Sequence, residues 1–257
     1  MTGTPSSQSH ELSGIVMTNS KPLAIITGAG RGIGRAVAIR FTQLGYRLVL
    51  VSRTTEQLQE TLRLLGTTIS NSDAIAVTAD VTIASDMQKV VDQAIKFTGR
   101  IDVVVNNAGS ASLLTVEGTT PAEFDGQIAV NLSGAFYLTH YAWPHLKQSK
   151  GVIINVSSQA ARDPLVTPDG TFHAYAAAKA GLNLLTLTLA REGAPLGIRA
   201  FSIAPGAVET KALRDIASKE VFPEHLTLSP DDVAQTIEAC ITGPLRHASG
   251  EVIWMKR

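Results

Sequence analysis

The chain has 257 residues, of which 44% are hydrophobic, a length and composition that suit one domain with a substantial core. Its 22 Lys and Arg residues balance 22 Asp and Glu residues, so its net charge gives no reason to expect a nucleic acid or an anionic membrane as a partner. The single cysteine, Cys240, excludes an intrachain disulfide and a cysteine-built metal site, and the six histidines lack metal-ligand spacing, so we expect no bound metal.

The first twenty residues differ in character from the rest. They lack the basic start and apolar centre of a signal peptide. No apolar run in the chain approaches the ~20 residues that a membrane-spanning helix needs. We expect residues 1–20 to be a disordered tail, or an extension before a second possible start at Met17, and residues 21–257 to form a single domain. The expected location is the cytoplasm.

From residue 21 onward, short apolar runs alternate with longer helical segments. The runs are rich in Val and Ile without polar alternation, which is typical of strands buried on both faces of a parallel sheet. They span 23–27, 47–51, 74–78, 101–105, 151–157, 198–203 and 250–255. The helical segments span 34–44, 54–65, 84–98, 122–148, 175–192 and 230–241. This alternation predicts an α/β fold of the Rossmann type, a doubly wound parallel sheet of about seven strands with helices on both faces. Pro144 should kink or end its helix.

The first strand leads directly into the glycine-rich stretch TGAGRGIG, residues 27–34, after which a helix begins at once. Glycine permits a tight turn and lets backbone N–H groups approach a pyrophosphate, and the helix N-terminus adds partial positive charge. A position between the first strand and the first helix is the context that dinucleotide binding requires. The candidate cofactor-binding residues of this turn are Gly28, Gly30, Arg31, Gly32, Ile33 and Gly34.

The second strand ends in Ser52 and Arg53, where dinucleotide folds that prefer NAD usually carry an acid against the ribose 2′-hydroxyl. No carboxylate stands here. Arg53, with Arg31 from the first turn, suits a 2′-phosphate instead, so the sequence favours NADP(H). The alternative is that both arginines are ordinary surface charges.

A later stretch, TFHAYAAAKAGLN over residues 171–183, carries Tyr175 and Lys179 in a run of alanines. Alanine favours a helix, and four residues separate the two side chains by little more than one turn, so they share a face. An ammonium near a phenol lowers the phenol's pKa, which could make Tyr175 a proton donor and acceptor. Taken alone, this spacing also arises by chance in many helices.

Together these motifs resemble the short-chain dehydrogenase/reductase family, from about residue 21 to the C-terminus. TGAGRGIG is similar to its cofactor turn, YAAAK to its catalytic Tyr-x-x-x-Lys, and ADV, NNAG and PGAVET to further cofactor segments. The resemblance adds as cofactor-binding residues Asp80, Val81, Asn107, Ala108, Gly109, Tyr175, Lys179, Pro205, Gly206, Val208 and Thr210. It implies a catalytic tetrad of Asn131, Ser158, Tyr175 and Lys179. Ser157 competes with Ser158, but adjacent strand residues face opposite ways and the family pattern favours Ser158.

The resemblance implies an NADP(H)-dependent oxidoreductase that interconverts a small-molecule carbonyl and a secondary alcohol, as a homodimer or homotetramer. A 3-oxoacyl-[acyl-carrier-protein] reductase is an alternative within the family, and a non-catalytic dinucleotide sensor or scaffold is an alternative of another class.

The chain departs from the family in two places. The interval from Ser158 to Tyr175 is longer than expected and contains RDPLVTPDG, which should border the substrate pocket. The segment between Thr210 and Ser229, where relatives carry a substrate lid, is short.

Overall fold

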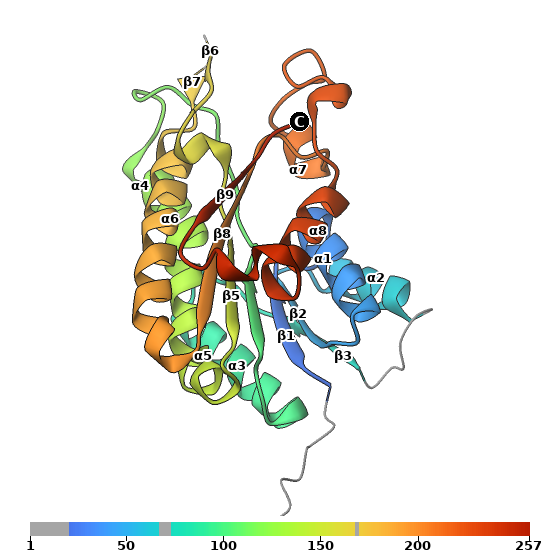
Figure 1. The fold of residues 1–257 in the computed structure, drawn as a ribbon. Coiled ribbons are helices and arrows are strands. Elements are labelled where there is room, and N and C mark those ends of the chain that lie inside the picture. The colour runs from blue at the N-terminus through green and yellow to red at the C-terminus, as the bar shows by residue number, and fades with distance from the viewer. Residues whose placement is uncertain (1–20, 67–72, 168–169) are drawn as a thin grey trace, which may run out of the picture.

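A seven-stranded parallel sheet forms the centre of the computed structural model, which describes residues 21–66, 73–167 and 170–257 (Figure 1). The tail predicted for residues 1–20 lies outside the described residues. The strands are β1 (Leu23–Thr27), β2 (Arg47–Ser52), β3 (Ala74–Thr78), β4 (Val103–Asn106), β5 (Val152–Val156), β8 (Arg199–Pro205) and β9 (Val252–Met255). Their spatial order is β3-β2-β1-β4-β5-β8-β9, with every neighbouring pair parallel. The predicted doubly wound sheet is therefore confirmed.

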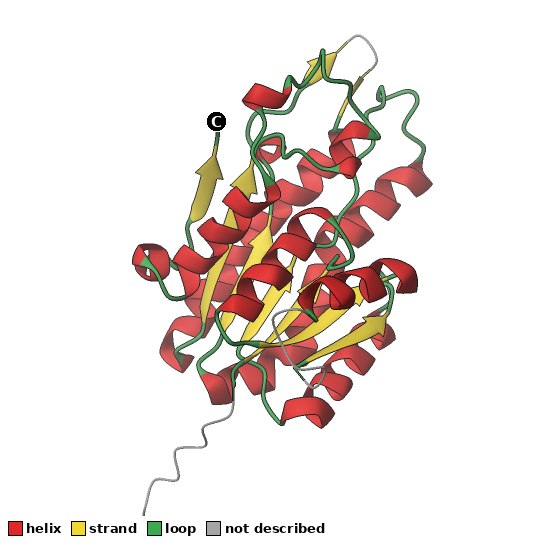
Figure 2. Ribbon diagram, turned by 90° about the vertical axis from the view of Figure 1, so that its right-hand side faces the viewer, coloured by secondary structure: helices red, strands yellow, loops and turns green. Residues whose placement is uncertain are grey.

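Helices cover both faces of this sheet (Figure 2). On one face, α1 (Gly32–Gln43), α2 (Thr55–Leu65) and α8 (Pro230–Ile241) share an apolar cluster with one set of strand residues, including Ile26. On the other, α3 (Ala84–Thr98), α5 (Gly134–Ser149) and α6 (His173–Gly193) share a second cluster with the alternate set, including Ile25. Successive side chains of a strand point to opposite faces of the sheet, and helices cover both faces. These strands are therefore apolar throughout their length.

The helix predicted over 122–148 is divided into three pieces. A first helix, α4 (Pro121–Ile128), begins at a capping box formed by Thr120 and Glu123. A π-helical turn over Ala129–Ser133 follows, and α5 then continues to Ser149. The prediction that Pro144 could end the helix is wrong, because α5 runs through it. Proline removes one N–H, and near the C-terminal end of a helix that loss affects a single backbone hydrogen bond.

Two small elements stand beyond the carboxyl ends of the strands, and the sequence pattern did not predict either. One is a hairpin of β6 (Val166–Thr167) and β7 (Gly170–Thr171), and the other is the short helix α7 (Lys211–Arg214) (Figure 1). Single 3₁₀ turns occur at Gln159–Ala161, Ala194–Leu196, Glu224–Leu226 and Pro244–His247. The hairpin and α7 lie on either side of the sheet edge at which β4, β5 and β8 end.

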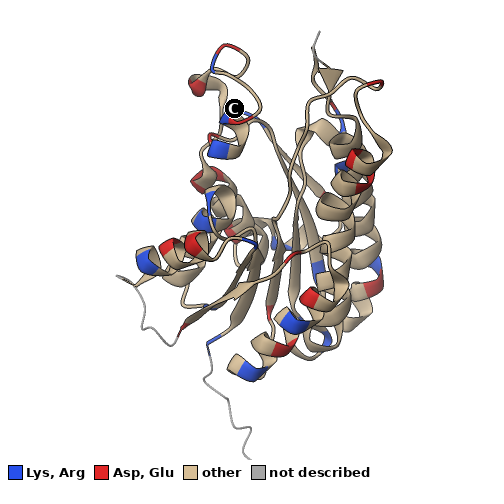
Figure 3. Cartoon of the chain, turned by 180° about the vertical axis from the view of Figure 1, so that it is seen from behind, with Lys and Arg blue, Asp and Glu red and all other residues tan. Residues whose placement is uncertain are grey.

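Charges of both signs are mixed over the outer surfaces of the helices (Figure 3). Several form ion pairs within or between neighbouring helices, such as Arg40 of α1 with Glu238 of α8. In the described part of the chain, no helix has both the length and the hydropathy to cross a bilayer.

Candidate active site

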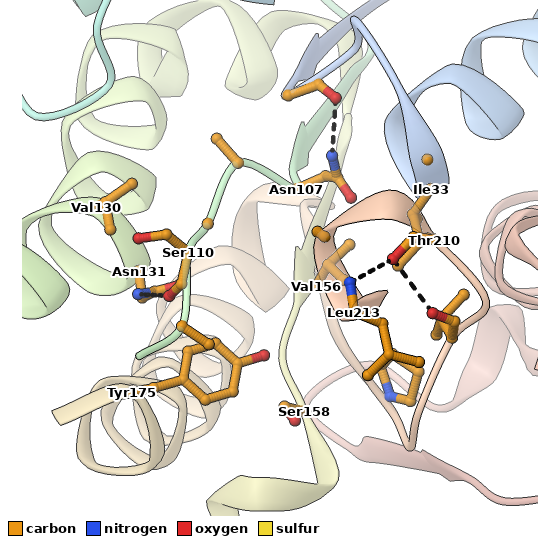
Figure 4. Close-up of a pocket in the computed structure, with 18 of the residues that line it drawn as sticks. Ile33, Asn107, Ser110, Val130, Asn131, Val156, Ser158, Tyr175, Thr210 and Leu213 are labelled. Atoms are coloured by element: carbon orange, nitrogen blue, oxygen red, sulfur yellow. Dashed lines mark hydrogen bonds between the residues drawn. The ribbon is translucent and has the colours of Figure 1, made fainter. Parts of the chain in front are cut away.

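A cavity of about 520 Å³ opens at the carboxyl ends of the strands, where β1 and β4 lie side by side and the strand order reverses (Figure 4). Open α/β sheets bind ligands at such a switch point. The predicted site residues that line it are Gly28, Gly30, Arg31, Gly32, Ile33, Ser52, Arg53, Asp80, Val81, Asn107, Ala108, Gly109, Asn131, Ser158, Tyr175, Lys179, Pro205, Gly206, Val208 and Thr210. Gly34 alone among the predicted residues does not line it.

The glycine-rich turn is built by close backbone packing. Gly28 has a φ of 65°, and a Cβ atom there would lie 2.7 Å from Asn107 Nδ2. A Cβ atom at Gly34 would lie 2.3 Å from the carbonyl oxygen of Gly28, so Gly34 lets helix α1 start directly against the turn. The Asn107 side chain donates to the carbonyl of Thr27 at 2.8 Å and thereby ties the ends of β1 and β4 together.

This turn fits the pyrophosphate of a dinucleotide. Helix α1 begins at Gly32, and its first turn, residues 32–35, carries no acidic residue. A Cβ atom at Gly30 would lie 2.8 Å from the side chain of Gln57, so glycine lets the turn pack closely against helix α2. The first N–H groups of a helix attract anions, and here they lie beside the cavity.

The end of β2 places Ser52 and Arg53 at the same cavity. The Ser52 hydroxyl accepts a hydrogen bond from the N–H of Thr54 at 3.1 Å, which fixes the start of the next turn. The Arg53 side chain is 72% exposed, and its Nη1 lies 3.9 Å from Oδ2 of Asp80. An exposed ion pair at this distance contributes little free energy, so the guanidinium stays available to a ligand.

The side chains of Asn131 and Lys179 both lie next to Gly109, where a Cβ atom would be 2.6 Å from Asn131 Oδ1 and 3.5 Å from Lys179 Nζ. The π-helical turn directs Asn131 Nδ2 to the carbonyl of Ser110 at 2.8 Å (Figure 4), and α6 directs Lys179 Nζ to the carbonyl of Val156 at 2.7 Å. Both side chains are buried. Asn131 Oδ1 is buried too, and no described residue donates a hydrogen bond to it. Since buried acceptors are normally satisfied, this oxygen has room for a further donor.

Tyr175 and Ser158 face the cavity from neighbouring elements (Figure 4). Tyr175 lies one turn before Lys179 on α6, and Lys179 Nζ is 5.6 Å from the centroid of its ring. Ser158 follows β5, and its hydroxyl accepts from the N–H of Ala160 at 3.1 Å. The hydroxyl of Ser157 donates instead to the backbone carbonyl of Lys179 at 3.2 Å and is buried. The two serines therefore differ as expected, with Ser158 beside the phenol.

Comparison with known proteins agrees with this geometry. The family model described as short chain dehydrogenase matches residues 22–221. The chain belongs to this family. An uncharacterized oxidoreductase of Staphylococcus epidermidis is 33% identical over 231 residues, which cover 90% of this chain and 95% of that protein.

Two solved structures of other short-chain dehydrogenases illustrate the similarity in fold. A 3-ketoacyl-(acyl-carrier-protein) reductase from Brucella melitensis, complexed with NADH, has a TM-score of 0.82 at 30% identity, covering 92% of this chain and 97% of that one. An alcohol dehydrogenase from the archaeon Thermococcus sibiricus, complexed with 5-hydroxy-NADP, has a TM-score of 0.77 at 26% identity, covering 92% and 96%.

Burial controls the ionisation of the two central groups of this short-chain dehydrogenase. Burial raises the pKa of the Tyr175 phenol, and the Ser158 hydroxyl partly opposes that rise. Burial also lowers the pKa of the Lys179 ammonium to about 7. The Lys179 ammonium is directed at the Val156 carbonyl, and burial of the phenol is the main influence on the pKa of Tyr175. The predicted lowering of this pKa by Lys179 stays a prediction.

Sequence reasoning missed a group of cavity residues that belong to no motif. They are Gln159, Asp163, Leu165, Phe172, Leu213, Ile216 and Phe222. Asp163 and Leu165 lie in the stretch RDPLVTPDG, so the expectation that this loop borders the pocket is confirmed. Its unusual length was the only signal that pointed to them. Leu213, Ile216 and Phe222 lie in the short segment where relatives carry a substrate lid, but no sequence pattern indicated which of its side chains line the cavity, because a short irregular segment has no periodicity.

Proposed function

We propose that this chain is an NADP(H)-dependent oxidoreductase that interconverts a carbonyl and a secondary alcohol, with Tyr175 as the acid and base. One observation carries the proposal: the Tyr175 phenol, Ser158, Lys179 and Asn131 line the same cavity as the glycine-rich turn. Bound NADH in the Brucella reductase and the NADP derivative in the Thermococcus alcohol dehydrogenase support a nicotinamide cofactor. The glycine turn, Asp80, Val81 and the segment from Pro205 to Thr210 would hold it.

Reduction of a ketone needs a hydride on carbon and a proton on oxygen. A bound nicotinamide would supply the hydride. Tyr175 supplies the proton, and because burial raises its pKa it is fully protonated at neutral pH. Ser158 donates a hydrogen bond to the carbonyl oxygen and stabilises the charge that develops there. Tyr175 is thus prepared for the direction of reduction.

Lys179 and Asn131 would support proton transfer by Tyr175 without contacting the substrate. With a pKa of about 7, Lys179 is an ammonium for part of the time at neutral pH. In oxidation Tyr175 must act as a base near neutral pH, and lowering the pKa of a phenol by about 3 units takes roughly 4 kcal/mol of differential stabilisation. A Lys179 ammonium directed at the phenol and the ribose hydroxyls would contribute part of it. The open Oδ1 of Asn131 would accept from a water that relays protons towards Lys179.

Replacing Tyr175 with Phe tests the catalytic assignment. The ring and its packing survive, and only the transferable proton is lost. We expect turnover to fall by about 10²–10⁴-fold, the usual contribution of a placed acid, with the Kd for NADPH nearly unchanged. A variant that keeps most of its activity would show that Tyr175 is not the acid.

The preference for NADP(H) follows from Arg53 and Arg31. A guanidinium matches a phosphate with paired donors, and a hydrogen bond to a charged group contributes about 1.5–3 kcal/mol, or roughly 10- to 100-fold. The wild type should favour NADPH over NADH in kcat/KM by at least about tenfold. Ser52→Asp with Arg53→Ala should reverse the preference, since a carboxylate repels a 2′-phosphate and accepts from a 2′-hydroxyl. A wild type that prefers NADH would refute the assignment of Arg53.

A second candidate within the same chemistry is reduction of a 3-oxoacyl group on an acyl-carrier protein. The similarity to the Brucella reductase favours it. Comparing kcat/KM for an acetoacetyl thioester with that for simple ketones separates the two candidates. A non-catalytic sensor would show NADPH binding without turnover of any carbonyl compound.

A further inference from the structure

The cavity extends past Tyr175 between two apolar walls. The first wall is formed by Leu165 and Phe172, and the second by Leu213, Ile216 and Phe222. We call these five residues the apolar slot. The ring of Phe172 lies edge-on to that of Tyr175, with centroids 6.0 Å apart, so the first wall begins at the proposed acid. Figure 4 shows Leu213 across the cavity from Tyr175.

The side chains of the slot are incompletely buried by the protein itself. Leu165, Leu213, Ile216 and Phe222 are all half-buried, although each is a large apolar residue in contact with the cavity. Apolar surface left at a cavity gains free energy when an apolar ligand covers it. The slot therefore favours a substrate with a hydrocarbon body next to its carbonyl.

The second wall is held in place by Arg214. Its Nε donates to Glu209 Oε1 at 2.9 Å, and its Nη1 donates to the carbonyl of Phe222 at 2.9 Å and to that of Ser218 at 3.2 Å. Thr227 adds a hydrogen bond to Glu209. A wall fixed in this way loses little conformational freedom when a ligand binds. Arg214 itself does not line the cavity.

The charges near the slot disfavour an anionic substrate. Asp163 lines the cavity, whereas its partner Arg162, whose Nε lies 3.1 Å away, stacks over the ring of Trp254 and does not line it. Lys211 lines the cavity next to Thr210 on the proposed cofactor side, and its Nζ pairs with Asp215 at 2.5 Å. A carboxylate in the slot would meet apolar surface and the carboxylate of Asp163, which is costly.

We infer that the substrate is an uncharged ketone or secondary alcohol with an apolar body, which the apolar slot holds against Tyr175. This inference rests on the proposed function. It favours simple apolar ketones over keto acids.

Three acetophenones that differ only at the para position test this inference. They are 4-methylacetophenone, 4-acetylbenzoate and 4-(aminomethyl)acetophenone, which are neutral, anionic and cationic. With NADPH, the wild type should reduce the neutral ketone with a kcat/KM at least about tenfold above that of the anion.

Asp163→Asn should narrow this gap in kcat/KM by raising the rate with the anion alone. Phe222→Ser should lower kcat/KM for the neutral ketone about tenfold at unchanged Kd for NADPH, and Phe124→Ser, a half-exposed Phe outside the cavity, is the control.

A binding measurement separates failure of this inference from failure of the proposed function. A wild type that prefers 4-acetylbenzoate or the cationic ketone would overturn the inference and leave the proposed function intact. If no ketone is reduced, the proposed function fails, and the neutral dye Nile red then tests the slot. Binding that 4-methylacetophenone displaces and that Phe222→Ser weakens would support the slot. Dye binding that is absent, or equal in Phe222→Ser, would overturn it.

Discussion

At the scale of single residues, burial of Lys179 lowers its pKa at a cost to the stability of the fold. Its side chain is 3% exposed, and the carbonyl of Val156 is the acceptor that its Nζ reaches. A buried ammonium with so few partners is costly, which is why its pKa falls to about 7 from 10.5. Such a group destabilises the fold, and destabilised charged groups are typical of functional sites.

The low pKa of Lys179 predicts a specific dependence of stability on pH. Between about pH 7 and pH 10 the unfolded chain keeps a proton on Lys179 that the folded chain has lost, so this group makes the free energy of unfolding rise with pH. The contribution is at most about 1.4 kcal/mol per pH unit. Lys179→Met removes it and should be more stable than the wild type near pH 7. Urea unfolding of cofactor-free protein at several pH values measures the difference in slope between the two.

Lys89→Met is the control, because Lys89 is exposed on α3 and pairs there with Asp86. It should leave the slope of stability against pH unchanged. Equal slopes for the wild type and Lys179→Met would show that Lys179 is an ordinary ammonium in the fold. Lys179→Met should in addition bind NADPH more weakly, and normal affinity would show that Lys179 does not hold the ribose.

At the level of elements, the sequence predicts best those strands and helices that carry a repeating pattern of apolar residues. All seven strands were predictable because a strand covered by helices on both faces is apolar throughout, as in β1 and β4. The division of the helix over 122–148 was not, because the π-helical turn depends on contacts such as that of Asn131 with the distant Ser110 carbonyl. Strands as short as β6 and β7 have no period to read.

The candidate site divides in the same way. The glycine turn and the Tyr175–Lys179 pair are local patterns whose chemistry follows from spacing on one element. The apolar slot combines side chains from two irregular segments far apart in sequence, such as Phe172 and Phe222, and only tertiary structure brings them together. Orientation was also beyond the sequence: nothing in it directs the Lys179 ammonium at the Val156 carbonyl and not at the phenol.

The hairpin of β6 and β7 is attached to the loop that follows β4. Leu114 and Thr171 exchange two backbone hydrogen bonds, of 3.2 and 3.0 Å. Gly170 has a φ of 131°, and a Cβ atom there would lie 2.2 Å from the backbone of Leu114. Gly170→Ala should therefore separate the hairpin from this loop and raise the KM for ketone substrates several-fold, because Leu165 and Phe172, which flank the hairpin in sequence, line the slot. The Kd for NADPH should stay unchanged.

Gly99→Ala is the matched control for that variant. Gly99 also has a positive φ, of 77°, but a Cβ atom there would contact nothing within 4 Å. Both variants share the backbone strain of about 1 kcal/mol or more, and only Gly170→Ala adds the clash. Steady-state kinetics with several ketones compares them. An unaltered ranking of substrates in Gly170→Ala would show that the hairpin does not shape the pocket.

Arg214 provides a second test at this scale, because it holds the other wall of the slot. Arg214→Met keeps the length of the side chain and removes the hydrogen bonds to Glu209, Ser218 and Phe222. We expect the KM for apolar ketones to rise about tenfold, since the wall must then be ordered by the substrate, with little change in kcat at saturation. Arg63→Met, which removes an exposed pair with Glu60 on α2, should change neither constant. A fall in kcat at unchanged KM would contradict a positioning role.

For the molecule as a whole, the two helical layers differ in what they leave exposed. On the layer of α3, α5 and α6, Phe136 of α5 is 48% exposed and Leu184 of α6 is 63% exposed. His140 stacks on Phe136 with ring centroids 6.0 Å apart and extends the same surface along α5. These exposed apolar side chains on two helices of one layer are the observation from which we predict a surface that another protein covers. The zero net charge does not oppose association of two copies.

We therefore predict that the protein forms a homodimer or homotetramer through α5 and α6. Phe136→Glu combined with Leu184→Glu would place charges in an apolar contact, which should raise the dissociation constant at least about a hundredfold and yield monomers in sedimentation velocity. Ile39→Glu, at a 37% exposed apolar position on α1 in the opposite layer, should sediment like the wild type.

Far-UV circular dichroism checks that the variants remain folded. Because the cavity lies at the carboxyl ends of the strands and not on this layer, the folded monomer should still bind NADPH. A double variant that sediments with the wild type would show that assembly, if it occurs, uses another face.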